Sequence, residues 1–231
     1  MHKKIRGFTL AEVLITLGII GIVAAMTIPT LIARVDHAQK ISLLKKAHSA
    51  INQSVRLASD DYGDFTSWDN KLSTMDFLQK YIAPYMKITL YCTNYKVCNY
   101  TSSTPWKRYN GNGDYTGFNV FSRIPFFTVD GILYSISLSG GTTVPDPDVQ
   151  YDYNYIGKNA IFIDVNGSSL PNRFGNDVFM LVRNIDGSIM PLGYNLSDKN
   201  INNDCRKQGK CLYCAEKLRR NGWKSTADYP W

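Results

Sequence analysis

Glu12 is the residue whose chemistry most needs an explanation. It is one of only two glutamates in the 231-residue chain, and it directly precedes Val13–Ala33, a run of 21 residues without a charge. A carboxylate drawn to the middle of a bilayer costs roughly 2.5–3.5 kcal/mol. Glu12 therefore either lies in the headgroup zone, where a helix N-terminus favours it, or needs a partner of opposite charge.

A second group of candidate residues carries oxygen ligands. Asp164, Asn166, Asn172 and Asp177 lie within a short segment that also contains glycines and a proline. Ca²⁺ takes six to eight oxygens from carboxylates, amides and backbone carbonyls, so the segment is a candidate calcium site and calcium is the one cofactor considered. The spacing of an EF-hand is absent. The alternative is a connection made of Asn-Gly and Pro-Asn turns, in which Asp and Asn cap backbone groups.

The five cysteines form two groups, Cys92 with Cys98, and Cys205 with Cys211 and Cys214. In an oxidising compartment, disulfides are the first interpretation, with Cys92–Cys98 as the local pair. Cys205 is then expected to join Cys211 or Cys214, which leaves one free thiol. Four thiolates around zinc are the weaker alternative, because the spacing differs from common zinc sites.

The sequence contains few residues in patterns typical of a catalytic site. The only histidines after the first seven residues are His37 and His48, both within one helical pattern. A nucleophile elbow, a phosphate loop and a His-rich metal motif are all missing. The sequence therefore predicts a protein that is not an enzyme.

The apolar run and the charges around it predict a membrane protein with one span. Val13–Ala33 is about 30 Å long as a helix, which matches the hydrocarbon core of a bilayer. Lys3, Lys4 and Arg6 precede it, so the positive-inside rule places the N-terminus in the cytoplasm and the rest outside. The net charge of +7 is otherwise concentrated between residues 205 and 224, unlike the even charge of a protein that coats nucleic acid.

The N-terminal residues resemble a known family signal. A basic leader ends in Gly7 and is followed by Phe8, Thr9 and Leu10; Glu12 is the fifth residue after Gly7, and Pro29 lies further along. This pattern resembles the class III signal of type IV pilins and type II secretion pseudopilins, with Ala11 where a larger aliphatic residue is commoner.

The resemblance implies cleavage after Gly7 by a prepilin peptidase and methylation of the new Phe8 amine. That amine can pair with Glu12 of a neighbouring subunit and fix the register of packed helices. The segment around Asp164 also resembles a loop of major pseudopilins, of which some members bind calcium.

The rest of the chain predicts an α+β, pilin-like fold. Apolar residues recur at helical spacing from Val35 to Val55, so one helix is expected from Phe8 to about Ser59, bent or locally melted at Pro29. It packs on an antiparallel meander of four or five strands, with hairpin turns at Asp130-Gly131 and Asp186-Gly187. A short second helix is expected to begin with a capping-box-like start at Ser73 and to have an apolar face that includes Phe77 and Ile82. The expected parts are a leader (1–7), the long helix (8–60) with its transmembrane segment (13–33), a helix and loop-rich insertion (61–115), the sheet (116–193), and a basic Cys-containing tail (194–231).

We therefore expect a prepilin-like structural subunit of a type IV pilus or type II secretion pseudopilus. The expected partners are other pilin or pseudopilin subunits, a prepilin peptidase, an inner-membrane assembly platform and, before assembly, membrane lipid. The chain is first a single-pass inner-membrane protein and then part of a periplasmic pseudopilus or a surface pilus.

Three alternatives stay open. A minor pilin can bind DNA or glycans through the basic tail. An ordinary secretory signal can be cut near residues 23–25. Finally, the span can be a plain anchor for an unrelated domain.

Overall fold

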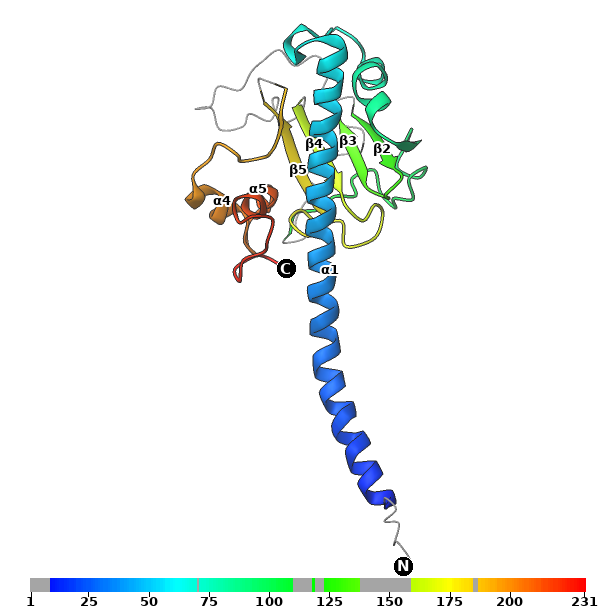
Figure 1. Cartoon of the computed structure of the whole chain (residues 1–231), viewed down its shortest axis with the longest axis vertical. Coiled ribbons are helices and arrows are strands. Elements are labelled where there is room, and N and C mark those ends of the chain that lie inside the picture. Colours follow the sequence, from blue (N-terminus) through cyan, green and yellow to red (C-terminus); the bar gives the residue numbers. More distant parts are fainter. Residues whose placement is uncertain (1–8, 70, 110–117, 119–122, 138–158, 185–186) are drawn as a thin grey trace, which may run out of the picture. The chain divides into compact units, whose positions relative to one another are not determined.

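The computed structural model describes residues 9–69, 71–109, 118, 123–137, 159–184 and 187–231. The chain divides into two compact units, Met1–Gln39 and Lys40–Trp231. Helix α1 (Leu10–Tyr62) begins in the first unit and ends in the second, and all other elements belong to the second unit (Figure 1). The predicted long helix is therefore confirmed and ends slightly later than expected.

Helix α1 continues without a break across Pro29, so of the two predicted alternatives, a bend or local melting, melting is not observed. Its part within the second unit has a clear buried stripe. The apolar stripe residues lie three or four positions apart, as expected for one face of a helix. They are Ile41, Leu44, Ala47, Ile51, Val55 and Ala58.

The sheet has six antiparallel strands in the order of the sequence, so the predicted meander is confirmed and the strand count is higher than predicted. The additional strand, β1, lies in a segment predicted to be loop-rich, where Thr89 and Leu90 are exposed and give little alternating pattern. The strands are β1 (Ile88–Tyr91), β2 (Ile124–Thr128), β3 (Leu133–Ile136), β4 (Ala160–Asp164), β5 (Val178–Arg183) and β6 (Ile189–Pro191).

Both faces of the central strands are covered. On one face Tyr134 of β3 donates from its hydroxyl to the carbonyl of Ala47 in α1 (3.5 Å), and α1 crosses the strands in Figure 1. On the other face the ring of Trp106 stacks on Phe162 of β4, with ring centroids 5.1 Å apart. Because both faces are covered, every residue of β4 is buried.

The helix after α1 begins as predicted. The Ser73 hydroxyl accepts from the amide of Asp76 at the start of α2 (Thr74–Phe77), which is N-terminal capping. The helical path continues through η2 (Leu78–Ile82) and η3 (Ala83–Tyr85), and the predicted apolar face, which includes Phe77 and Ile82, is buried.

Two short helices in the basic tail were not predicted. They are α4 (Asp198–Asp204), capped by Ser197, and α5 (Cys214–Arg220). The predicted Asp130-Gly131 turn is present, with Gly131 at a φ of 77°, a conformation that favours glycine. Of the second predicted turn, Asp186-Gly187, the aspartate lies outside the described residues.

Candidate functional site

Glu12 lies in the first turn of α1 and caps that turn together with Thr9. Its Oε2 accepts from the Thr9 backbone amide and from the Thr9 hydroxyl, both at 2.8 Å. The Glu12 amide in turn donates to Thr9 Oγ1 at 3.3 Å. This reciprocal arrangement is a capping box, so the carboxylate stabilises the helix start in a single chain and stays at the surface.

The apolar residues after Glu12 are exposed along the first unit. Leu14, Ile20 and Ile32 are 62%, 63% and 63% exposed, and a Cβ built at Gly18 or Gly21 would meet no atom within 4 Å. The hydroxyls of Thr16, Thr27 and Thr30 donate to backbone carbonyls of the same helix. A helix whose polar groups are satisfied internally and whose apolar side chains point outward suits lipid or the surface of other helices.

Among the described residues, α1 is the one helix long and apolar enough to cross a membrane.

The predicted oxygen ligands come together at the end of β4. Asp164 is fully buried, and its Oδ2 accepts from Tyr100 Oη (2.8 Å) and Trp106 Nε1 (3.1 Å). Oriented with its nitrogen toward acceptors, the Asn172 amide also donates to Asp164 Oδ2 (3.1 Å). Burial, followed by the charge of Asp177, raises the pKa of Asp164 well above its usual value.

Asp177 caps backbone amides in the same segment after β4. Its two carboxylate oxygens accept from the backbone amides of Asn172 (2.9 Å) and Arg173 (2.7 Å). Its neighbour Asn176 accepts from Nζ of Lys40, a buried lysine of α1, at 2.7 Å. Burial raises the pKa of Asp177, and the positive charge of Lys40 opposes that shift.

This donor set does not fit calcium well. Three of the four carboxylate oxygens of Asp164 and Asp177 already accept from protein groups. Oδ1 of Asp164 and Oδ1 of Asn166 are buried side-chain oxygens without a hydrogen-bond partner. Ca²⁺ takes six to eight oxygens, so the ion would also need occupied carboxylate oxygens, backbone carbonyls or water. The described residues also contain no group of three or more His, Cys, Asp or Glu side chains placed to hold a metal.

A calcium titration tests the site directly. We expect millimolar Ca²⁺ to leave the melting temperature of the chain unchanged, because three of the four carboxylate oxygens already accept hydrogen bonds from protein groups. A rise in melting temperature that is lost in Asp164→Ala would assign the ion to this segment.

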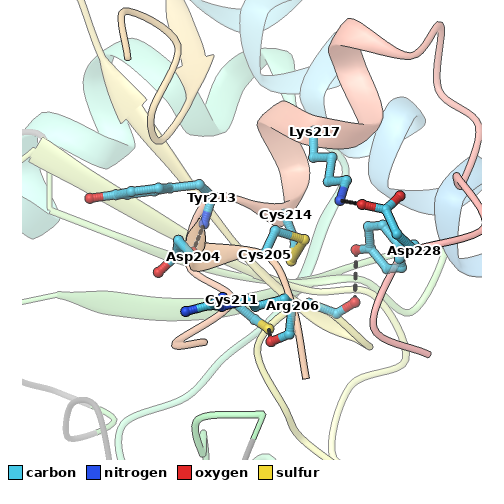
Figure 2. The surroundings of a disulfide bond; sticks show 10 residues. Asp204, Cys205, Arg206, Cys211, Tyr213, Cys214, Lys217 and Asp228 are labelled. Atoms are coloured by element: carbon cyan, nitrogen blue, oxygen red, sulfur yellow. Dashed lines mark hydrogen bonds and ion pairs between the residues drawn. A yellow bond between two sulfur atoms is a disulfide. The ribbon is translucent and has the colours of Figure 1, made fainter. Parts of the chain in front are cut away.

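The cysteines form two disulfides, Cys92–Cys98 and Cys205–Cys214. Figure 2 shows the second of these with Cys211, which is a buried free thiol. Burial, followed by the charge of Asp204, raises the pKa of the Cys211 thiol to about 12. Since the thiolate is the reactive form, Cys211 is expected to be unreactive in the folded chain.

The basic tail is partly neutralised by its own acids. Glu216 is fully buried and accepts from both Arg219 and Arg220 at 2.7 Å. Lys217 pairs with Asp228 at 2.6 Å. His48 of α1 packs against Trp223 of the tail, with ring centroids 5.5 Å apart, so this histidine has a packing role.

Comparisons with known proteins identify the N-terminal segment. Residues 2–28 match the family model described as the prokaryotic N-terminal methylation motif. The chain carries the class III signal of type IV pilins and pseudopilins. Residues 30–110 match a family of unknown function. No curated protein and no solved structure matches the chain.

The pilin-type signal has general consequences for this chain. The motif implies in general a prepilin peptidase and other pilin subunits as partners, and together with the long apolar helix it fits membrane anchoring. Of the residues that the resemblance singles out, Glu12 and Pro29 lie in α1, whereas Gly7 and Phe8 lie outside the described residues.

Sequence reasoning overlooked two features near these sites. Thr9 forms the capping box with Glu12 of the pilin-type signal, and the spacing Thr9-x-x-Glu12 was a usable sign of it. Lys40 places a buried ammonium next to the predicted calcium ligands. It carried no sequence signal, because a lysine on a helix is usually exposed.

Proposed function

We propose that this chain is a structural, non-enzymatic subunit of a type IV pilus or type II secretion pseudopilus. It is cleaved after Gly7, held in the inner membrane with its N-terminus in the cytoplasm, and then assembled through the first half of α1. The observation that carries the proposal is the N-terminal signal, with Glu12 at the start of an exposed apolar helix.

The same apolar surface serves both stages of this function. Before assembly it contacts lipid, and after assembly it contacts the helices of other subunits, so the exchange requires little change in the chain itself. Gly18 and Gly21 leave room for close helix contact. A Glu12 carboxylate inside such a bundle needs a positive partner, and the Phe8 amine of a neighbouring subunit supplies one.

Sequencing of the N-terminus of the mature protein tests the proposal. We expect the protein purified from its host membrane to begin at Phe8, with an N-methylated amine visible as an added methyl mass. Gly7→Val is expected to block processing, whereas Gly21→Val, at a site where nothing lies within 4 Å, is expected to be processed normally. A mature chain that begins at Met1, or near Ala25, would contradict the proposal.

A further inference from the structure

A disulfide closes a short basic loop in the tail. The loop spans residues 205–214, and between Cys205 and Cys214 it contains three basic residues and no acid. These residues, Arg206, Lys207 and Lys210, are all exposed. Backbone bonds from Gly209 to Arg206 and from Cys211 to Asp204 hold the path of the chain. We call this segment the basic loop.

The basic loop carries most of the unneutralised positive charge of the tail. The basic residues of α5 are paired with acids, as described for Glu216 and Asp228. Asp204, directly before the loop, accepts from the amide of Tyr213 at 2.8 Å, and the charge of Lys210 acts on its carboxylate without forming an ion pair. Among the described residues, the side chains of the basic loop form no ion pair.

The opposite charge gathers at the C-terminal end of α1. Residues 60–76 contain five aspartates and one basic residue, Lys71. Asp60, Asp61 and Asp64, which we call the acidic end, are exposed. No basic residue lies in the last turn of α1, so the acids also face the negative end of the helix dipole, where they are unfavourable.

Contacts within the second unit place the two patches at different levels along α1. A Cβ on Gly175 would lie 2.9 Å from both the Cβ of Cys211 and the Sγ of Cys214, and the next residue, Asn176, contacts Lys40. The basic loop is therefore near the Lys40 level of α1. The acidic end lies about 30 Å further along the helix, and Figure 1 shows α4 and α5 well below the upper end of α1.

We propose that the basic loop binds the acidic end of a second copy of this chain, displaced along α1 by about the distance between the two patches. The inference rests on the proposed assembly into a filament. Asp61 accepts from the Tyr85 hydroxyl, but among the described residues neither patch forms an ion pair, and the two patches are opposite in charge. Exposed ion pairs are individually weak and screened by salt, but a group of them sets the register and orientation of association.

Charge reversal at both patches tests this contact. We compare Lys207→Glu/Lys210→Glu, Asp60→Lys/Asp64→Lys and the combination of all four in the full chain expressed with its assembly system. Each reversal alone is expected to lower the yield of sheared filaments about tenfold, a loss expected to shrink at high salt. The combination is expected to recover the yield to within about threefold of the parent. Lys87→Glu/Lys96→Glu changes two exposed lysines elsewhere and is expected to have no effect.

Processing at Phe8 is measured in every variant. This measurement distinguishes a wrong contact between patches from a wrong proposed function. If the parent is processed and forms filaments but both reversals assemble as well as the parent, or the combination fails to recover, the contact is overturned and the proposed function stands. If the parent is not processed or forms no filaments, the proposed function fails and the contact with it. A gel shift of duplex DNA that is lost in Lys207→Glu/Lys210→Glu, with filament yield unchanged, would assign the loop to nucleic acid and overturn the contact.

Discussion

The two halves of α1 have the same backbone conformation but opposite relations to their surroundings. Within the first unit, large apolar side chains such as Leu14 and Ile20 are more than half exposed, whereas Leu44, Ala47 and Ile51 in the second unit are fully buried. The first half is apolar on all sides, and the second half is apolar on one stripe that packs against the sheet. Among the described residues, the second half of α1 is therefore buried along one stripe, whereas the first half is exposed.

The two halves of α1 are therefore expected to have different roles, one in folding and one in assembly. Burial of the stripe stabilises the second unit by roughly 25 cal/mol per Å² of apolar surface removed from water. The exposed surface of the first half gains this stabilisation only from lipid or from other helices. Changes in the first half are therefore expected to alter assembly, and changes in the second half to alter folding.

The largest expected effect is that of Glu12→Ala. If Glu12 pairs with a neighbouring Phe8 amine, the variant leaves that amine unpaired in an apolar bundle, a loss of about 3–5 kcal/mol. We expect filament yield to fall at least about 100-fold, while the melting temperature of the second unit stays unchanged. Thr9→Val, which removes the hydroxyl of the capping box but keeps the carboxylate, serves as the control and is expected to assemble. Assembly of Glu12→Ala at the yield of the parent would rule out the pairing.

Phe162→Ala should show the opposite behaviour. Phe162 is fully buried in β4 and stacks on Trp106, and removing such a ring costs about 3–5 kcal/mol of stability. Urea unfolding followed by tryptophan fluorescence should show this loss, while cleavage after Gly7 continues. Leu170→Ala, at a side chain that is 81% exposed, should leave the unfolding midpoint unchanged. A loss of processing in Phe162→Ala would show that folding of the second unit and processing of the first half of α1 are not separate.

Asn52→Ala tests the hydrogen bonds between the second half of α1 and the edge strand β6. The Asn52 side chain donates to the carbonyl of Ile189 (2.8 Å) and accepts from the Ile189 amide (2.9 Å). It therefore acts as a substitute for a further strand beside β6. Its loss leaves a backbone amide without its partner, which costs about 1–3 kcal/mol. Gln53→Ala, the exposed neighbour on the same helix, is the control; equal stability of the two variants would contradict this role.

The sequence predicted the elements with strong patterns and missed those that depend on tertiary contacts. The N-terminal helix, the capping by Ser73 and the Asp130-Gly131 turn follow from local chemistry and are present. Strand β1 was missed, because it lies at the sheet edge and its pairing with β2 cannot be read from a mostly exposed segment. Helices α4 and α5 were missed, because each is only seven residues long. In α5 the buried Glu216 also depends on its pairs with two arginines, and these pairs give no periodic apolar pattern.

The smallest expected effect is the dependence of stability on pH that Asp164 produces. Burial and the charge of Asp177 raise the pKa of this carboxyl, although Tyr100 and Trp106 donate to it. The folded chain therefore keeps a proton that the unfolded chain releases near pH 4, so stability falls as the pH rises above that value. Asp164→Asn cannot ionise, so we expect the loss of unfolding free energy between pH 5 and pH 7 to be smaller in the variant than in the parent. Urea unfolding at the two pH values measures the difference, and an identical loss in both proteins would mean that Asp164 is ionised in the folded chain. Because Asp164 belongs to the second unit, Asp164→Asn should leave the filament yield unchanged. This result would again separate the folding role of the second unit from the assembly role of the first half of α1.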